Sequence, residues 1–379
     1  MGLLLTEDHR LLVEAVREFA RRELPQLDRE WDRTETSCCT ELGSLYDMGL
    51  MGLRVLEKHG GLECPMIVYG HIIRELAFAS PSVAVTISVH SMVSEIISMY
   101  ATEAVRNEIQ PQLTQPGNLA AFAISEPNAG SDPASASTRA VKVPGGYKLS
   151  GSKMWVTNGL TGRWFVVMAR IGDARTKDLC MLLIDAQQPG VTRNPIHGKM
   201  GIRGSETAEM ALDGAFVPDE HLLGEPGWGM RIGLSSLDGG RIGIASQAVG
   251  IAEACLDEMT RYTRQREQFG RPIADFQAIQ WMIADSATEI AAAQVLIDRA
   301  ATLKDDGKPY SREASMAKLY ASEAANRIAY RAVQSHGGYG FVHEFRVEQL
   351  YRDARITTIY EGTSEIQRYV IARSLLRTP

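Results

Sequence analysis

Three stretches of the sequence hold more glycine and small polar residues than packing requires, and one of them places a carboxylate just before a helix. They read SEPNAGSDP at 125–133, QSHGGYGF at 334–341 and IYEGTSEIQRYVIAR at 359–373. In the third stretch Glu361 and Gly362 precede Thr363 and Ser364, either of which can cap the helix that the following apolar period predicts. A carboxylate beside a glycine can come close to a bound molecule and take a proton from it.

Each stretch also has a purely structural interpretation. The first is a turn, the second ends a helix with Gly337 or Gly338 in left-handed geometry, and Glu361 complements a helix dipole. A lone histidine such as His336 is more often structural than catalytic. No G-x-G-x-x-G motif stands at a strand-to-helix junction, so a Rossmann dinucleotide site has no support. Taken singly, the stretches leave both interpretations open.

The spacing of apolar residues predicts helices before a block of strands. Thr6 can cap a first helix, whose apolar stripe consists of Leu11, Leu12, Ala15, Val16 and Phe19. A further helical segment runs from Val68 to Ala79. Between about Phe122 and Leu223 the sequence changes to short runs divided by Gly, Pro, Asn and Asp, namely FAIS, YKLSG, KMWVT, WFVVMA, CMLLID and AEMALD.

After GEPGWG the helical period returns in three stripes. They consist of Ile244, Ala248, Ile251, Cys255 and Met259, of Ile279, Ile283, Ala287 and Ile290, and of Ala314, Ala317, Ala321, Ala324 and Ile328. The short polar connector KDDGKP predicts that these helices pack as antiparallel neighbours in a bundle. Helices, strands and helices in this order indicate an α+β protein with one separate β domain.

Composition narrows the class of protein. A chain of 379 residues with 45% hydrophobic and 23% charged residues is typical of a soluble globular protein with two or three structural units. A net charge of -6 without a dense Lys/Arg block argues against nucleic acid and anionic membranes as partners. The five cysteines are scattered and form no C-x-x-C pair, so we expect neither disulfides nor a metal site.

The expected compartment is the cytoplasm. The N-terminus carries acidic residues by the seventh position, unlike a signal peptide. We also expect no apolar stretch near the roughly 18 to 20 residues that span a bilayer.

Six motifs in order resemble the acyl-CoA dehydrogenase family over nearly the whole chain. They are FAISEPNAGSD from Phe122, WVTN from Trp155, GIRGS from Gly201, REQFG from Arg266, QSHGG from Gln334 and the closing RDARITTIYEGTSEIQR. One such match would be weak, whereas six in order make chance implausible. The C-terminal half, including LDGGRIGIASQ, is most similar to the short-chain branch.

The resemblance implies three domains and a bound FAD. The domains are an N-terminal helical domain at 1–120, a middle β-barrel-like domain at 121–226 and a C-terminal four-helix bundle at 227–379, in subunits that form homotetramers. The flavin ring of FAD would contact Ser125, Trp155, Val156 and Thr157, with Thr157 facing the reactive N5. The further cofactor-binding residues implied are Phe122, Ile124, Gly130 and Ser131. The residues that would hold the FAD of the neighbouring subunit are Arg266, Phe269, Gln277, Gln334, Ser335, Gly337 and Gly338, and Thr363 and Glu365 would contact its adenine end.

By the same resemblance, Glu361 removes the α-proton of an acyl-CoA thioester while the β-hydrogen leaves as hydride to the flavin, giving the trans-2-enoyl-CoA. Its backbone N–H and a ribityl hydroxyl would stabilise the enolate oxygen. The substrate-binding residues implied are Ser131, Asp238, Arg241, Tyr360, Glu361 and Gly362. Some branches carry the base one residue before Arg241, where this chain has Gly240, so the base is Glu361 or there is none. For Asp238 and Arg241 the alternative is a solvated charge pair at the start of a helix.

The acyl end of the pocket departs from the family pattern. The usual V-P-E-E-Y-G-G reads VLEKHGG, with Lys58 and His59, and His90 stands on the pocket-lining helix where Asn or Gln is common. The arginine of the glutaryl-CoA branch is Ala84 here, which argues against a dicarboxylate. We expect a short or medium acyl group, branched or polar.

Three further functions stay open on this fold. They are an acyl-CoA oxidase, a dehydrogenase of carrier-protein-bound acyl thioesters, and a catalytically silent helical partner subunit. The resemblance implies electron-transferring flavoprotein as the electron acceptor of an active enzyme.

Overall fold

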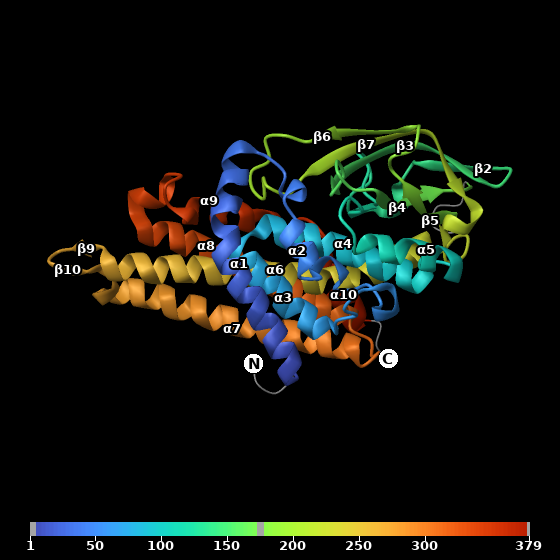
Figure 1. The fold of residues 1–379 in the computed structure, drawn as a ribbon. Helices are drawn as coiled ribbons and strands as arrows, with labels where there is room; N and C mark the ends of the chain where they lie inside the picture. Colours follow the sequence, from blue (N-terminus) through green and yellow to red (C-terminus); the bar gives the residue numbers. More distant parts are fainter. Residues whose placement is uncertain (1–4, 173–177, 377–379) are drawn as a thin grey trace.

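The order of elements along the chain is helices, strands and helices, as the sequence predicts (Figure 1). This computed structural model describes residues 5–172 and 178–376. The N-terminal helices are α1 (Glu7–Thr34), α2 (Gly43–Asp47), α3 (Met66–Ala79), α4 (Pro81–Tyr100) and α5 (Glu103–Leu113). Short 3₁₀ turns join them at η1 (Cys38–Thr40), η2 (Leu50–Gly52) and η3 (Glu57–His59).

Helix α1 begins at its predicted cap but turns a different face inward. The Thr6 hydroxyl accepts a hydrogen bond from the His9 backbone N–H at 3.2 Å. The predicted stripe is partly wrong, because Leu11 is 61% exposed and Ala15 is also exposed. The buried residues are Val13, Val16, Ala20, Leu24, Asp28, Trp31 and Asp32. Periodicity shows which residues share a face, and packing against α3 decides which face is buried.

Helix α4 corrects the expectation about membrane-spanning length. It has 20 residues and is apolar enough to cross a bilayer by length and composition, yet 83% of its apolar window is buried inside the protein. No other helix in the described ranges passes this test. Its side chains pack on α3, α6 and the sheet, so α4 is a core helix that joins the three parts of the chain.

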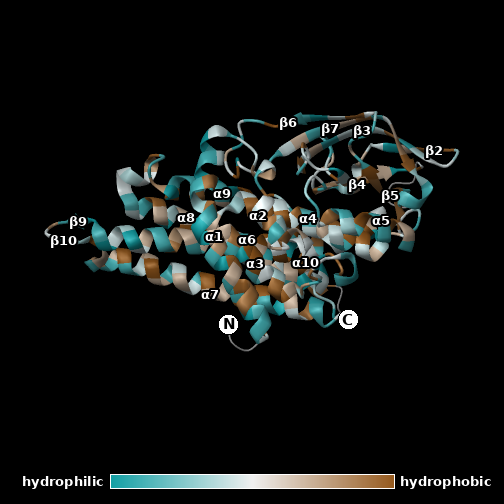
Figure 2. Ribbon diagram, in the orientation of Figure 1, coloured by the Kyte–Doolittle hydropathy of each residue, from teal (hydrophilic) through white to brown (hydrophobic). Residues whose placement is uncertain are grey.

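The middle part is one eight-stranded sheet in the order β6-β7-β3-β2-β4-β5-β8, with β1 pairing in parallel with β4. Its strands are β1 (Ala120–Ala123), β2 (Arg139–Val143), β3 (Gly146–Thr157), β4 (Trp164–Arg170), β5 (Leu179–Asp185), β6 (Val191–Pro195), β7 (Thr207–Pro218) and β8 (Leu222–Leu223). The predicted runs YKLSG and KMWVT are one long strand, because Gly151 continues β3. Both faces of β4 and β5 are covered, and Figure 2 accordingly shows β5 as hydrophobic.

The C-terminal part is a bundle of long helices that extends to the left in Figure 1. Its elements are α6 (Gly229–Gln265), the small hairpin β9 (Glu267–Gln268) and β10 (Arg271–Pro272), α7 (Gln277–Asp305), α8 (Ser311–His336), α9 (Arg346–Ile356) and α10 (Ser364–Leu376). The predicted stripes of α6 and α8 are buried. On α7 only Ile290 of the predicted set is fully buried, and Ala287 is exposed.

Candidate active site

Glu361 stands in a tight turn between α9 and α10. Its φ is +54°, and the φ of the following Gly362 is +90°. A glutamate in this left-handed region costs free energy that the surroundings must offset. The Gln367 side chain does so in part, because its Nε2 donates to the carbonyls of Glu361 at 3.2 Å and Gly362 at 2.8 Å. Thr363 caps α10, since its hydroxyl accepts from the Ile366 N–H at 3.3 Å.

The carboxylate of Glu361 is desolvated, and one of its oxygens has no hydrogen-bond partner in the described part of the chain. The residue as a whole is half-buried, but its Oε2 is fully buried and has no partner among the described residues. Burial raises the pKa of Glu361 to about 7, while the positive charges of Arg241 and Lys318 act to lower it. The side chain is therefore close to the protonation balance that a general base needs near neutral pH.

Helix α6 passes directly against this carboxylate at Gly240. A Cβ at position 240 would lie 2.7 Å from Oε2 of Glu361 and 3.3 Å from the sulfur of Met92. Position 240 carries the base in other branches of the resembled family. A side chain there would occupy the space that the Glu361 carboxylate fills in this chain.

Lys318 is a functional candidate that the sequence analysis missed. Its side chain is fully buried in α8, and its Nζ donates to the Gly362 carbonyl at 2.7 Å. Burial lowers the pKa of Lys318 to about 7, and the nearby Glu361 acts to raise it. A signal was available, because Lys318 lies four residues after Ala314 and three before Ala321, on the apolar stripe.

The buried Arg241 pairs with the half-buried Asp238 inside α6, so the alternative of a solvated pair at a helix start is wrong. Only 3% of Arg241 is exposed, and its guanidinium binds both Asp238 and the Ser315 hydroxyl, the latter at 3.2 Å. The Ser311 hydroxyl donates to Asp238 at 2.8 Å. Helix α6 begins at Gly229, well before this pair.

Tyr360 fixes the turn from the other side. Its hydroxyl donates to the Gln247 side chain, and the Gln247 Nε2 donates to the Pro81 carbonyl at 2.9 Å. The Tyr360 ring packs against a small apolar cluster of Val85, Val89 and Ile202. Gln247 is completely buried in α6, and although it ends the stretch LDGGRIGIASQ, the sequence analysis gave it no role.

A β-bulge shapes the strand expected to contact the flavin. The register of β3 against β7 shifts between Lys153 and Val156, and Trp155 has a φ of +60° and is 62% exposed. Of the other predicted contacts, Ser125 is held by its carbonyl, which accepts from the Met154 N–H at 2.9 Å. Phe122, Ile124 and Thr157 are half-buried, whereas Gly130 and Ser131 lie exposed in the loop.

The loop after β1 depends on a buried ion pair that the sequence analysis also missed. Lys153 Nζ donates to Glu126 at 2.7 Å and to the Ile124 carbonyl at 3.1 Å. Glu126 also accepts from the backbone N–H groups of Ser137 at 2.6 Å and Thr138 at 3.0 Å. Burial alone would raise the pKa of Glu126, but Lys153 lowers it to about 2.

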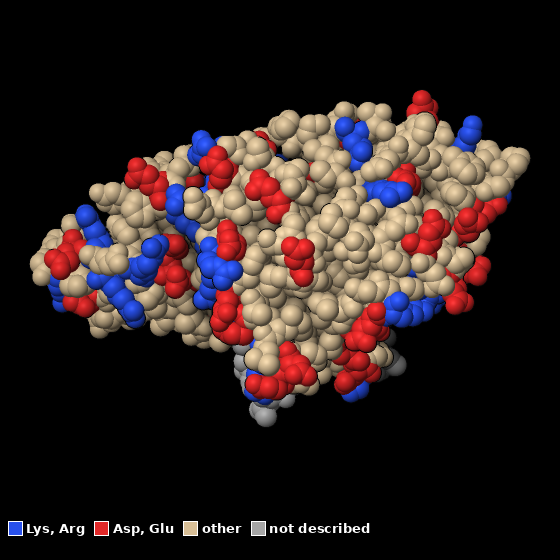
Figure 3. All heavy atoms as spheres, in the orientation of Figure 1, with Lys and Arg blue, Asp and Glu red and all other residues tan. Residues whose placement is uncertain are grey.

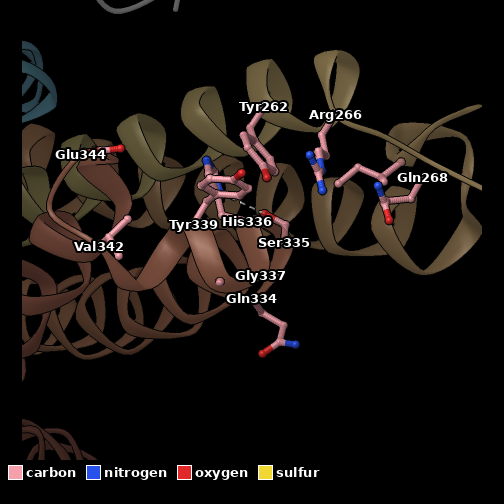
Figure 4. Close-up of a pocket in the computed structure, with 12 residues that line it drawn as sticks. Tyr262, Arg266, Gln268, Gln334, Ser335, His336, Gly337, Tyr339, Val342 and Glu344 are labelled. Carbon is pink, nitrogen blue, oxygen red and sulfur yellow. Dashed lines mark hydrogen bonds between the residues drawn. The ribbon is translucent and has the colours of Figure 1, made fainter.

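A second group of predicted residues lines one cavity of about 640 Å³ at the far end of the bundle. Arg266, Gln334, Ser335, Gly337 and Gly338 all contribute to it. In Figure 4 Tyr262 and Arg266 project from the α6 side toward the segment around Ser335 and Tyr339. Phe269 and Gln277 lie outside the lining, and Phe269 is 93% exposed in the β9–β10 hairpin.

His336 belongs to this cavity as a structural residue with one free nitrogen. Its ring stacks on Tyr262 with centroids 4.1 Å apart, and Nδ1 contacts the Ala332 carbonyl at 2.7 Å. Nε2 is buried and has no partner in the described part of the chain. Gly337 is the C-cap of α8, as the structural interpretation expected, but its φ of +60° and ψ of −136° are not the left-handed helical geometry of that interpretation. Thr363 and Glu365 lie apart from this cavity, beside Glu361.

The three residues that depart from the family pattern, Lys58, His59 and His90, do not line the cavity next to Gly240. Lys58 and His59 form the surface turn η3, and the cavity next to Gly240 is lined by other residues. His90 is completely buried and structural, since its Nδ1 accepts from the Ala120 N–H and its Nε2 donates to the Leu113 carbonyl, both at 3.0 Å. Burial lowers the pKa of His90 to about 4, so the ring is neutral.

No group of three or more His, Cys, Asp or Glu side chains that could hold a metal ion occurs within the described ranges. On the face drawn in Figure 3, lysine and arginine side chains alternate with aspartate and glutamate.

Three family models match the chain consecutively. They are described as acyl-CoA dehydrogenase N-terminal domain at residues 6–116, middle domain at 121–215 and C-terminal domain at 227–376. The mitochondrial short-chain specific acyl-CoA dehydrogenase of Mus musculus is 40% identical over 377 residues, which cover 99% of this chain and 91% of that protein.

Solved structures give the same picture. A chain from the structure of the electron transferring flavoprotein of Acidaminococcus fermentans has a TM-score of 0.97 at 37% identity, and butyryl-CoA dehydrogenase from Megasphaera elsdenii has a TM-score of 0.96 at 36% identity, each with 100% of both chains covered. The prolyl acyl carrier protein oxidase AnaB has a TM-score of 0.94 at 30% identity, with 98% of this chain and 99% of that chain covered.

Proposed function

The chain belongs to the acyl-CoA dehydrogenase family, and from that premise we propose that it oxidises the Cα–Cβ bond of a short acyl-CoA with Glu361 as the base. It is an oxidoreductase that acts on the CH–CH group of acyl-CoA, and its cofactor is FAD. The observation that supports the assigned base is the buried, unpartnered Oε2 of Glu361 together with its raised pKa.

The residues present fit FAD at two places. Arg266 offers a guanidinium fork suited to a pyrophosphate in a cavity that also contains the orphaned Nε2 of His336. The bulge between Lys153 and Val156 leaves the indole of Trp155 exposed on the strand expected to face the flavin, where it can pack against a planar ring. When bound, the cofactor accepts the hydride from the β-carbon.

Glu361 supplies the other half of the reaction. The α-proton of a thioester is weakly acidic, so its removal requires a positioned base and donors for the developing enolate oxygen. The carboxylate takes the proton at Oε2. The backbone N–H of Glu361 makes no hydrogen bond elsewhere in the described part of the chain, so it is free to donate to the thioester carbonyl. Bound substrate excludes water and so raises the pKa of Glu361 further, which favours its protonated form.

Asp238 and Arg241 are proposed to position the CoA portion, with Ser131 at the mouth of the site. Arg241 also limits how far the pKa of Glu361 rises. The remaining residues assigned by resemblance to the cofactor and the substrate are kept as proposals, as are the domain boundaries after residues 120 and 226.

Partners and compartment follow from the same premise. We propose electron-transferring flavoprotein as the acceptor, a homotetramer as the assembly, and the cytoplasm as the compartment. The exposed apolar side chains of Phe269 (93%), Val295 (68%) and Trp281 (63%) support the assembly, because a second subunit would cover them. Analytical ultracentrifugation showing a monomer at micromolar concentration would contradict the tetramer.

One experiment tests the reaction itself. Purified protein is titrated without oxygen against a panel of saturated acyl-CoA thioesters while flavin absorbance is followed. We expect bleaching by at least one short thioester, and no bleaching by any of them would contradict the proposed function. A colourless protein that cannot be loaded with FAD would favour the silent partner subunit.

The similarity to AnaB gives the carrier-protein alternative an observation of its own. Presenting the same acyl group on CoA and on a carrier protein separates the two substrates. Hydrogen peroxide released under air, compared with dye reduction, separates an oxidase from a dehydrogenase.

A further inference from the structure

A small cavity lies next to Gly240, the residue of α6 that faces the carboxylate of Glu361. Its volume is about 10 Å³, which is room for one water molecule or one hydroxyl group. Much of its wall is polar and comes from three helices or their flanks, through Arg54, Tyr69, Ser91 and Glu95. Met66 and Met92 are flexible side chains in the remaining wall, so the cavity can widen a little when a ligand enters.

The charges around this cavity are matched. Arg54 Nη2 lies 2.9 Å from Glu95, and Lys304 Nζ lies 2.8 Å from the same carboxylate. Burial alone would raise the pKa of Glu95, but Arg54 and Lys304 lower it to about 2, so it stays ionised. A second carboxylate, Asp305, stands close by and caps α3 by accepting from the Met66 N–H at 2.6 Å. Two cations face two anions, so the cavity attracts neither an acid nor an amine by net charge.

Two polar atoms on cavity-lining residues have no hydrogen-bond partner within residues 5–172 and 178–376. Ser91 is 1% exposed, and its Oγ makes no hydrogen bond to any described residue. Arg54 Nε is likewise buried and unpaired. The other serines on this part of α4 behave differently: Ser94 donates to the His90 carbonyl at 2.9 Å, and Ser88 accepts from the Tyr69 hydroxyl at 3.0 Å. Ser91 is therefore a buried hydroxyl left open toward a ligand.

Two adjacent glycines of α6 lie between the base and the charged side chains around the cavity. A Cβ at Gly239 would lie 2.6 Å from Lys304 Nζ, and a Cβ at Gly240 would lie 2.7 Å from Glu361 Oε2. Gly240 also lines the cavity, as do Gly239 and Met92. Because the base and the polar cavity adjoin the same residue of α6, only a short acyl chain separates a carbon at the base from a group in the cavity.

We propose that the substrate is a short acyl thioester with a hydroxyl group on the carbon beyond Cβ, bound by Ser91 and Arg54. This inference rests on the proposed function for the reacting end of the chain. The hydrogens removed are those of Cα and Cβ, so the distal hydroxyl is bound and not oxidised. An aliphatic end would leave the Ser91 hydroxyl and Arg54 Nε without partners, and each such loss costs about 1 to 3 kcal/mol.

The test compares 4-hydroxybutyryl-CoA, butyryl-CoA and hexanoyl-CoA on the FAD-loaded enzyme with a dye acceptor. We expect kcat/KM for the hydroxylated thioester to exceed that for butyryl-CoA by about tenfold or more, with hexanoyl-CoA slower than both. In Ser91→Ala this ratio falls at least about fivefold, mainly through the hydroxylated substrate. The matched control is Ser94→Ala, on the same helix with its hydroxyl bonded inside the protein, and it keeps the wild-type ratio.

Butyryl-CoA equal to or better than the hydroxylated thioester, or a ratio that Ser91→Ala leaves unchanged, overturns the proposal. Calorimetric binding of the same thioesters separates it from the proposed function. The protein could bind 4-hydroxybutyryl-CoA at least tenfold more tightly than butyryl-CoA although no thioester bleaches the flavin. That result would contradict the proposed reaction and support the hydroxyl-binding cavity. Equal binding of the two thioesters counts against the pocket.

Discussion

Two glutamates with buried carboxylate oxygens, each near a buried lysine, have pKa values shifted in opposite directions. Glu126 contacts Lys153 at 2.7 Å and accepts hydrogen bonds from backbone N–H groups, and its pKa falls to about 2. Glu361 has a buried Oε2 without a partner among the described residues, and its pKa rises to about 7 because burial dominates. Lys318 bonds to the Gly362 carbonyl instead of to the carboxylate.

The difference teaches what separates a structural carboxylate from a proton acceptor. Partners satisfy the charge of Glu126 and fix the loop after β1 in place. The turn at Glu361 lies close enough to Arg241 and Lys318 for their charges to limit the rise of its pKa. None of the described residues makes a hydrogen bond to Oε2. Desolvation without pairing is what leaves a carboxylate able to take a proton near neutral pH.

The largest expected effect is on the rate of the Glu361→Gln enzyme. We expect kcat to fall about 10³-fold, because the amide keeps the shape but cannot accept the proton. Stopped-flow bleaching of the flavin measures this, and circular dichroism checks that the fold is kept. A variant that retains more than a tenth of the wild-type rate removes Glu361 from the mechanism.

The second effect is on stability and concerns the other glutamate. Glu126→Gln leaves the Lys153 ammonium buried without a counter-charge, so we expect the free energy of unfolding to drop by about 3 kcal/mol. Asp219→Asn is the control, because the Lys142–Asp219 pair is 57% and 50% exposed and should contribute no more than about 1 kcal/mol. Equal losses in urea unfolding would erase the distinction between the two pairs.

The two glutamates should also affect stability at opposite ends of the pH scale. The folded-state pKa of Glu361 is above its usual 4.5, so its contribution is full below pH 4.5 and is lost as pH rises toward 7. The folded-state pKa of Glu126 is below 4.5, so its contribution is present above that pH and is lost as pH falls toward 2.

Unfolding of wild type and Glu361→Gln in urea, from pH 5 to pH 8.5, measures the first of these. Over this pH range the free energy of unfolding of the glutamine variant should rise by about 1 to 3 kcal/mol relative to that of the wild type. A stability difference that does not change with pH would show that burial leaves the carboxylate unperturbed.

The smallest effect concerns Lys318. Replacing it with methionine removes a positive charge that lowers the pKa of Glu361, so that pKa should rise. The acid limb of kcat/KM then moves up by about one pH unit, and activity lost at pH 7 returns at pH 9. Lys318→Arg keeps the charge and should keep the profile. A uniform loss at all pH values would indicate a role in stability alone.

The sequence predicted the helix and strand blocks well where local signals decide them. The Thr6 cap, the buried stripes of α6 and α8 and the segment of strands all agree with the structure. Exposed Leu11 and Ala287 were assigned to apolar stripes, because a period does not reveal which neighbour a helix packs against. Gly151 looked like a break in the strands and is instead part of β3.

The candidate site was only partly accessible from sequence. The motifs pointed to Glu361, Arg266 and the Gln334–Gly338 segment, which the structure places in two distinct regions. The pairing of Glu126 with Lys153 could be found only in three dimensions, because the two residues are far apart in the chain. Lys318 had a signal in its place on the apolar stripe of α8, but its contact with the Gly362 carbonyl had none. The polar acyl end depends on Arg54, Glu95 and Lys304, which are far apart in the chain.

The most direct test of Glu361 as a poised base is the pH dependence of kcat/KM for the best thioester, measured from pH 5.5 to pH 9. We predict a rise with a single inflection near pH 7, set by Glu361 in the free enzyme, and no such inflection in the residual activity of Glu361→Gln. A flat wild-type profile, or the same inflection in the glutamine variant, would contradict the assignment.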